Sequence, residues 1–237
     1  MTNYRIERAR DSQDLARQAC ETIAAQIDLA LDQRDRCQIA LSGGSTPAKA
    51  YSLLSQERLP WDRVDVVLGD ERWVEAEDES SNAGMLRRTL LSSGPGASAA
   101  FHPVPTVELE SPEASSQAFA DQISKLCSGA PPVFDVMVLG LGDDGHTASL
   151  FPGTEAPEVV DRWTTIGRGK GLDRITLTAP VLSAARQVIF LVSGAGKKEA
   201  LRRLLDPSES SDRTPARLVQ PASDVLVLAD QDAAAGL

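Results

Sequence analysis

Hydrophobic residues along this chain gather in short continuous runs, each ending in glycine or small polar residues. The runs are Cys37–Leu41, Val64–Leu68, Phe134–Leu139, Ile175–Thr178, Val188–Val192 and Asp224–Ala229. Because they are continuously apolar and do not alternate with polar residues, they predict strands buried on both faces of a parallel sheet.

Helical patterns separate these runs. Asp11–Leu31 and Glu113–Leu126 are predicted as amphipathic helices, the second opened by a Ser-Pro pair. Strands that alternate with helices predict a doubly wound α/β fold, with a mostly parallel sheet and helices on both faces. The stretch 92–112, rich in Ser, Pro, Gly and Ala, is interpreted as an ordered excursion and not a hinge. We therefore predict one domain over residues 1–237.

The composition of the chain limits the classes of molecule that it is expected to bind. Of the 237 residues 42% are hydrophobic and 24% charged, as in a globular protein. The formal net charge of -10 argues against nucleic acid or an anionic membrane as the main partner. An anionic small substrate would need locally placed cations.

The cysteines and the N-terminus indicate a location. The first residues contain no apolar segment typical of a secretory signal, and no apolar run approaches the roughly 20 residues of a membrane span. Cys20, Cys37 and Cys127 are odd in number and far apart, which favours free thiols in a reducing compartment. We expect a cytoplasmic protein. No HxxxH, HxH or Cys cluster is present, so no metal site is predicted.

The segment Ser42–Pro47 (SGGSTP) joins a predicted strand to a helical pattern. Its glycines predict a tight turn with several unpaired backbone N–H groups, and the helix N-terminus that follows favours an anion. A capped connection that binds no ligand is the simpler alternative. The segment matches neither the GxxxxGK[ST] phosphate loop nor the GxSxG nucleophile elbow. Spacing alone leaves open a Ser-His-Asp hydrolase that uses Ser42, Ser45 or Ser149.

The segment Gly140–His146 (GLGDDGH) contains a literal GxGxxG after a strand. A dinucleotide site is disfavoured because Asp143 and Asp144 would place two carboxylates beside the pyrophosphate. Pro152 also cuts short the helix that should follow. We interpret the glycine spacing as a chance match and predict no cofactor.

His146 is the candidate proton-transfer residue. It is one of only two histidines and follows an Asp-Gly pair at a strand end, where ligands bind in parallel sheets. An imidazole titrates near neutrality, so it can take a proton from water and return it. Asp144 or Asp143 would orient it. A histidine that only caps the turn is the alternative, and His102 is interpreted as structural or exposed.

Three cations stand at strand ends or helix starts. Arg72 follows one strand run, Arg174 opens another, and Lys197 begins a helical pattern after SGAG. For each one a solvated surface charge is the commoner explanation. Their joint placement near the two glycine-rich segments favours a site for an anionic substrate.

These segments together resemble the 6-phosphogluconolactonase family. The resemblance runs in family order from about residue 40 to residue 205, and DGHTASLFPG is its most specific part. It is carried by SGGSTP, LGDERWV, SNAGMLRRTLL, FDVMVLGLGDDGHTASLFPG, RITLTAPVL and SGAGKKEAL, with the closing DQDAAAGL also similar.

The resemblance implies hydrolysis of 6-phospho-D-glucono-1,5-lactone to 6-phosphogluconate in the oxidative pentose phosphate pathway. It also implies a fold shared with glucosamine-6-phosphate deaminases and no cofactor. His146 then matches the family's proton-transfer histidine, and Asp144 its partner acid. Arg72 is expected to contact sugar hydroxyls or developing negative charge. The expected substrate and phosphate ligands are Gly43, Gly44, Ser45, Thr46, Asp70, Arg174 and Lys197.

Two other functions compete with this one. The deaminase branch shares the GxDGH core but carries a catalytic glutamate where this chain has Phe151, and DEY where it has Asp70-Glu71-Arg72. A non-catalytic sugar-phosphate-binding protein would keep the phosphate loop but need no histidine beside an aspartate. The approach to Arg174, GRGKGLDR, departs from the proline-rich sequence typical of the family there.

Overall fold

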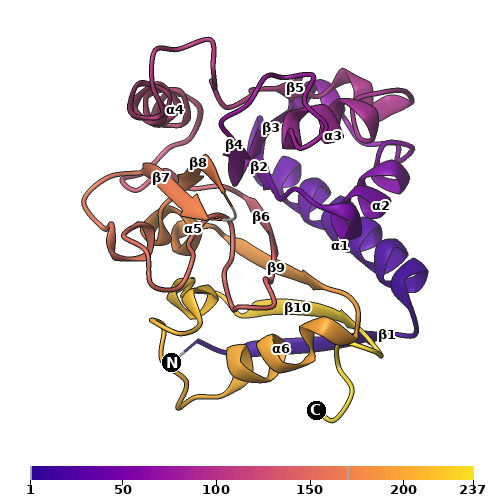
Figure 1. Ribbon diagram of the computed structural model, residues 1–237. Helices are drawn as coiled ribbons and strands as arrows, with labels where there is room; N and C mark the ends of the chain where they lie inside the picture. The colour runs from indigo at the N-terminus through magenta and orange to yellow at the C-terminus, as the bar shows by residue number, and fades with distance from the viewer. Residues whose placement is uncertain (1, 170) are drawn as a thin grey trace.

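The computed structural model describes residues 2–169 and 171–237, and its centre is a seven-stranded sheet in which every neighbouring pair is parallel (Figure 1). The predicted doubly wound α/β fold is confirmed. In spatial order the strands are β1 (Tyr4–Ala9), β10 (Val225–Asp230), β9 (Gln187–Val192), β6 (Val136–Gly140), β2 (Cys37–Leu41), β3 (Val64–Leu68) and β5 (Ala100–Phe101).

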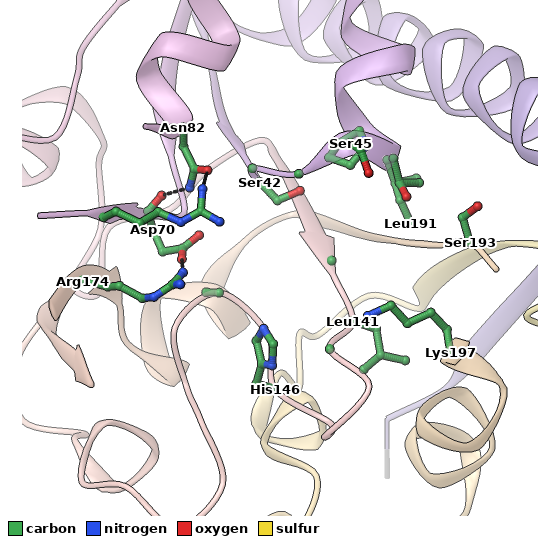
Figure 2. Close-up of a pocket in the computed structure, with 18 residues that line it drawn as sticks. Ser42, Ser45, Asp70, Asn82, Leu141, His146, Arg174, Leu191, Ser193 and Lys197 are labelled. Atoms are coloured by element: carbon green, nitrogen blue, oxygen red, sulfur yellow. Dashed lines mark hydrogen bonds and ion pairs between the residues drawn. The ribbon is translucent and has the colours of Figure 1, made fainter. Parts of the chain in front are cut away.

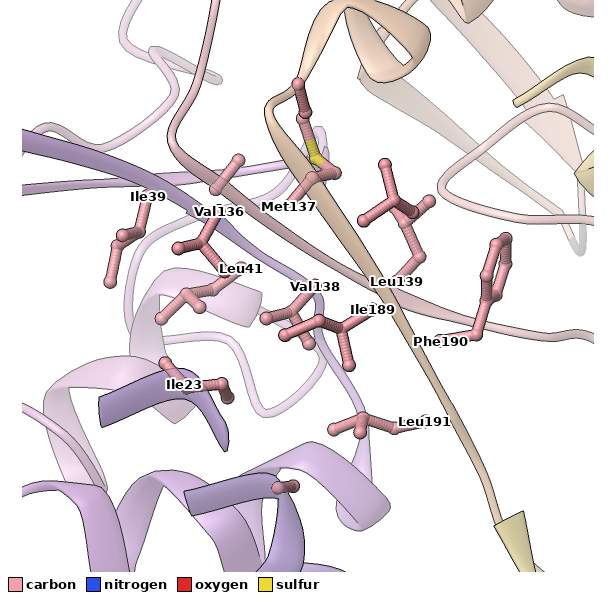
Figure 3. Close-up of a cluster of buried hydrophobic side chains, with 14 of the residues drawn as sticks. Ile23, Ile39, Leu41, Val136, Met137, Val138, Leu139, Ile189, Phe190 and Leu191 are labelled. Atoms are coloured by element: carbon pink, nitrogen blue, oxygen red, sulfur yellow. The ribbon is translucent and has the colours of Figure 1, made fainter. Parts of the chain in front are cut away.

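Both faces of the central strands are covered. Successive side chains of a strand point to opposite faces, yet Val136, Met137, Val138 and Leu139 are all fully buried (Figure 3). The continuous apolar runs in the sequence have this cause. These central strands show no alternation with polar residues because neither of their faces meets water.

The two helices predicted at Asp11–Leu31 and Glu113–Leu126 are present, and each starts within one residue of the predicted position. Asp11 caps the longest one by accepting hydrogen bonds from the backbone N–H groups of Gln13 and Asp14. Buried residues such as Ile23 and Ile27 recur along one side of it, and it packs beside α2 and against the strands (Figures 1 and 3). The helices are α1 (Ser12–Gln33), α2 (Ser45–Leu54), α3 (Asn82–Arg88), α4 (Pro112–Leu126), α5 (Ala179–Ala184) and α6 (Lys198–Leu205).

A second sheet corrects one expectation. The run at Ile175–Thr178 was predicted as a strand of the parallel sheet, but β8 (Leu172–Leu177) pairs antiparallel with β4 (Asp70–Arg72) and β7 (Thr164–Gly169). Ile175 and Leu177 are fully buried because this small sheet is covered as well. An apolar run reports burial, whereas strand direction depends on pairing.

The edge strands gave no signal in the sequence. The side chains of β1 are mostly exposed, and β1 pairs only with β10. Backbone hydrogen bonds hold such a strand without an apolar run. In the described residues no helix is long and apolar enough to cross a membrane.

The strand order changes direction between β2 and β6. From β2 the chain proceeds outward through β3 and β5, and from β6 it proceeds the other way through β9 and β10. Ligands of open α/β sheets bind at such a switch point, beyond the carboxyl ends of the strands. The loops that leave β2 and β6 there are SGG and GLGDDGH.

Candidate active site

A cleft of about 260 Å³ opens at this switch point (Figure 2). The structure brings together all but one of the predicted site residues in its wall, and the exception, Asp144, lies beside His146. The lining residues are Ser42, Gly43, Gly44, Ser45, Thr46, Pro47, Asp70, Arg72, Asn82, Gly140, Leu141, Gly142, His146, Ala148, Arg174, Leu191, Ser193 and Lys197.

His146 and Asp144 form a close pair within a tight loop. Nδ1 of His146 lies 2.5 Å from Oδ1 of Asp144, which also accepts the backbone N–H of His146 at 3.1 Å. The backbone N–H of Gly142 donates to the carbonyl of His146 at 2.8 Å. A Cβ on residue 142 would overlap both the imidazole and the Asp144 carboxylate, so this loop requires glycine there. Asp143 instead lies 3.9 Å from the ammonium of Lys197.

The loop after β2 presents the start of α2 to the cleft. Gly44 adopts a φ of 111°, which glycine tolerates, and α2 begins at the next residue. Among the described residues no side chain caps this helix. The hydroxyl of Tyr51 bonds both the N–H and the carbonyl of Ser42, and so fixes the entry to the loop. The N–H groups of the first turn of α2 therefore suit an anion.

Arg72 and Arg174 stand side by side because of strand register. They are direct partners in the antiparallel β4–β8 pair. Burial lowers the pKa of Arg174, an effect that Asp70 opposes and the positive charge of Arg72 reinforces. The carboxylate of Asp70 lies 3.9 Å from Arg174. Two neighbouring arginines with one close carboxylate favour a further anion in the cleft.

Buried polar side chains hold Arg72 in place. Glu71 accepts the backbone N–H groups of Arg72, Asn82 and Ala83, which ties β4 to the start of α3. Burial raises the pKa of Glu71 although these N–H groups act against it. The Asn82 side chain accepts from the Arg72 guanidinium and donates to the carbonyl of Asp70 at 2.8 Å (Figure 2).

Phe151 lies between two of the candidate residues. Its ring centroid is 4.5 Å from that of His146, and the guanidinium carbon of Arg174 is 5.5 Å from it. Gly169 of β7 makes room for this ring, since a Cβ there would come 2.5 Å from a ring carbon. The unusual GRGKGLDR segment is thus the β7–β8 hairpin, apart from Lys170, which lies outside the described residues.

The remaining polar residues of the DGHTASLFPG motif hold the cleft together. Thr147 donates to the carbonyl of Gly140 at 2.8 Å. Ser149 is fully buried and donates to Asp70 at 2.5 Å, so its hydroxyl faces Asp70 and not the cleft. Thr147 and Ser149 therefore each have a separate partner in the structure.

Sequence reasoning gave no role to several lining residues, including Asn82, Leu141, Leu191 and Ser193. Asn82 and Ser193 stand at the starts of two segments that resemble the family, so their positions carried a signal. Leu141 and Leu191 carried none, because an apolar residue at a strand end resembles any core residue.

The side chains of Lys197, Leu191 and Ser193 lie on one side of the cleft and Arg174 on the other (Figure 2).

Three comparisons agree on the relatives of this chain. A family described as "Glucosamine-6-phosphate isomerases/6-phosphogluconolactonase" matches residues 10–228. A 6-phosphogluconolactonase of Synechocystis is 39% identical over 96% of this chain and 95% of the relative, and one of Nostoc is 40% identical over 98% of each. The solved 6-phosphogluconolactonase of Trypanosoma brucei superposes with a TM-score of 0.88 at 29% identity over the whole of both chains.

Another solved structure, a monomeric glucosamine-6-phosphate deaminase, has a TM-score of 0.82 at 21% identity, covering 97% of this chain and 98% of the deaminase. At that identity the likeness shows a shared fold.

Proposed function

This chain belongs to the glucosamine-6-phosphate isomerase/6-phosphogluconolactonase family, and we propose that it hydrolyses 6-phospho-D-glucono-1,5-lactone to 6-phospho-D-gluconate in the oxidative pentose phosphate pathway. The observation that carries the proposal is one cleft that joins the His146–Asp144 pair to an anion-binding helix start and three cations. A phosphorylated lactone needs both parts of that cleft: the proton-transfer pair for its ester bond and the cations with the helix start for its phosphate.

His146 acts as the general base. Because Asp144 engages Nδ1, the proton from the attacking water goes to Nε2 as the water oxygen attacks C1. Asp144 stabilises the imidazolium that forms. When the tetrahedral intermediate collapses, the imidazolium returns the proton to the departing ring oxygen, which becomes a hydroxyl. A lactone is an activated ester, so this mechanism needs no covalent intermediate and no metal.

Cations serve the two ends of the substrate. The loop Gly43–Thr46 with Arg174 and Lys197 binds the phosphate, and this remote binding energy positions the reacting carbon. Arg72 stabilises the oxyanion, with its guanidinium held by Asn82. Asp70 contacts substrate hydroxyls from the same wall.

Phe151 argues for the lactonase over the deaminase. In the deaminase branch the corresponding position is a proton-transferring glutamate, which a phenylalanine cannot replace. The Phe151 ring also lies directly against His146, so an apolar group and not a carboxyl occupies that position beside the imidazole. We place the reaction in the cytoplasm, a location supported by three free, buried thiols, and expect no nucleic-acid or membrane partner for a chain of net charge -10.

The test is turnover of freshly prepared lactone, followed as appearance of 6-phosphogluconate and corrected for spontaneous opening measured without protein. A rate well above the spontaneous one supports the proposal. We expect this catalysed rate to persist in the presence of a chelator. Ammonia release from glucosamine 6-phosphate would indicate the deaminase instead. Binding of the product without any turnover would indicate a sugar-phosphate sensor.

A further inference from the structure

Two consecutive arginines of α6 differ in burial and in partners. The side chain of Arg202 is 54% exposed and pairs with Glu199 at 2.8 Å. Arg203 is only 7% exposed and lies beneath the helix, against the loop that carries His146. Burying a guanidinium costs free energy unless it forms hydrogen bonds. The placement of Arg203 therefore calls for an explanation that Arg202 does not need.

Arg203 binds the backbone of the catalytic loop. Its Nη2 donates to the carbonyl of Asp143 at 3.1 Å, and its Nη1 donates to the carbonyl of Arg213 at 3.5 Å. Nε is buried without a hydrogen-bond partner in residues 2–169 and 171–237. The Asp143 carbonyl belongs to the peptide unit that leads directly into Asp144. Arg203 thus fixes the backbone immediately before the carboxylate that contacts His146.

A second donor holds the backbone on the other side of Asp144. The N–H of Ala216 donates to the carbonyl of Gly145 at 3.0 Å. Ala216 is fully buried, as is Thr214, which lies under Gly145. Residues 213–216 therefore pack beneath the loop that carries His146, and Arg203 binds the backbone of this segment as well as that of the loop.

We propose that Arg203 is a positioning residue for the reaction: through the Asp143 carbonyl it fixes Asp144, and through Asp144 the imidazole of His146. This inference rests on the proposed function. Arg203 does not line the cleft, so it acts on the proton-transfer pair and not on substrate binding. Lys197, which immediately precedes the same helix, serves the phosphate. Helix α6 therefore sets the distance between the phosphate site and the general base.

The experiment compares Arg203→Met with Arg202→Met, measuring kcat and KM for the phosphorylated lactone. Methionine keeps an unbranched apolar stem like the methylene chain of arginine, but it removes the guanidinium and with it every donor. Because a misplacement of about 1 Å can cost roughly 10²-fold in rate, we expect Arg203→Met to lower kcat about 10- to 100-fold. We expect its KM to stay within about twofold of the wild-type value, and Arg202→Met to leave both constants within that range. Arg203→Lys, which restores a single cationic donor group, recovers part of the lost kcat.

A second measurement needs no turnover. With only two histidines in the chain, NMR resolves both rings, and His102 serves as an internal reference. The ring-proton shifts of His146 move in folded Arg203→Met, whereas those of His102 do not. Binding of 6-phosphogluconate, measured by calorimetry, stays near the wild-type affinity.

The outcomes separate the two proposals. Wild-type kcat in Arg203→Met, unchanged His146 shifts, or lost product binding would each overturn the positioning role. A wild-type protein that leaves the lactone at its spontaneous rate would overturn the proposed function, while the His146 shifts still report whether Arg203 positions the ring. If Arg203→Met does not fold, Arg203→Lys with the same three readouts decides the question.

Discussion

Three residues define the surroundings of the His146 imidazole. Asp144 holds one ring nitrogen, Phe151 lies against the ring, and Gly142 leaves the space that the ring occupies. The carboxylate selects the tautomer, and the phenyl ring keeps water from that side of the imidazole. At the residue scale, the His146–Asp144 pair is therefore already held in one arrangement in the absence of substrate.

Replacing His146 tests the general base. General acid–base assistance contributes typically ~10²–10⁴-fold, so we expect His146→Ala to lower kcat by about that factor while the fold persists. His102→Ala is the matched control, because His102 lies away from the cleft. Its Nε2 is 2.9 Å from Oδ1 of Asp65. Steady-state kinetics measures both. Near-wild-type kcat in His146→Ala would remove the assigned role.

Replacing Lys197 tests the phosphate site. We expect Lys197→Ala to raise KM for the phosphorylated lactone and to change KM little for the unphosphorylated lactone, since only the former carries the charge that Lys197 meets. Lys198→Ala, at the exposed neighbouring position, should leave both values unchanged. Equal effects of Lys197→Ala on the two substrates would contradict the assignment.

At the scale of elements, the small antiparallel sheet contributes one wall of the cleft. Its register places Arg72 opposite Arg174, and its β7 strand passes close enough to pack Phe151. Strands β3 and β4 are separated only by Gly69, whose carbonyl accepts from Leu177 of β8. The short connection passes the chain directly from the large sheet into the small one.

Gly169 tests how β7 supports the site. We expect Gly169→Ala to destabilise the protein by about 1–3 kcal/mol, because the added methyl group overlaps the Phe151 ring. Phe151→Leu should relieve part of that cost, so the double variant is more stable than the sum of the two single effects predicts. Urea unfolding measures all three. If the changes in unfolding free energy of the two single variants simply added in the double variant, Gly169 and Phe151 would not be coupled by packing.

Strand β3 carries a charge network at its other end, around Asp65. Burial alone would raise the pKa of this carboxyl, but hydrogen bonds from Arg36, His102 and Gln38 outweigh it and lower the pKa. A lowered pKa in the folded state means stability that is present above about pH 4, the ordinary value, and is lost as pH falls through the folded value.

The variant Asp65→Asn tests whether the stability that Asp65 contributes is lost in acid. We expect the variant to be less stable than the wild type at pH 7, where it lacks the anion that Arg36 and His102 bind. The difference should shrink as pH falls below about 4, because protonation makes Asp65 resemble asparagine. Unfolding free energies across this range provide the measurement. A difference that grows in acid would contradict the network.

At the scale of the whole molecule, the two sheets share buried residues and a continuous chain. We expect one domain over residues 1–237 and hence one cooperative unfolding transition. The tryptophans sample both sheets: Trp61 precedes β3, Trp73 follows β4, and Trp163 precedes β7. Tryptophan fluorescence and far-ultraviolet circular dichroism should therefore give the same midpoint. Two separate transitions would divide the chain into two units.

Local patterns determined much of this protein. The apolar runs of β2, β3, β6, β9 and β10 each correspond to a strand of the central sheet, because burial on both faces leaves a continuous hydrophobic signal. The predicted starts of two helices, at Asp11 and Glu113, lie within one residue of the observed starts, where Asp11 and Ser111 are the N-caps. The cleft at the strand ends followed from the parallel topology, and its histidine and cations were found from residue type and position.

Only the tertiary structure decided the rest. It pairs Asp144 and not Asp143 with His146, and it makes β8 (Leu172–Leu177) an antiparallel strand. It also places Asn82 and Arg203 beside residues that are distant in sequence. Such contacts depend on strand register and on side chains that approach from separate elements. Periodicity along the chain carries information about which residues are buried, but none about which partner each of them meets.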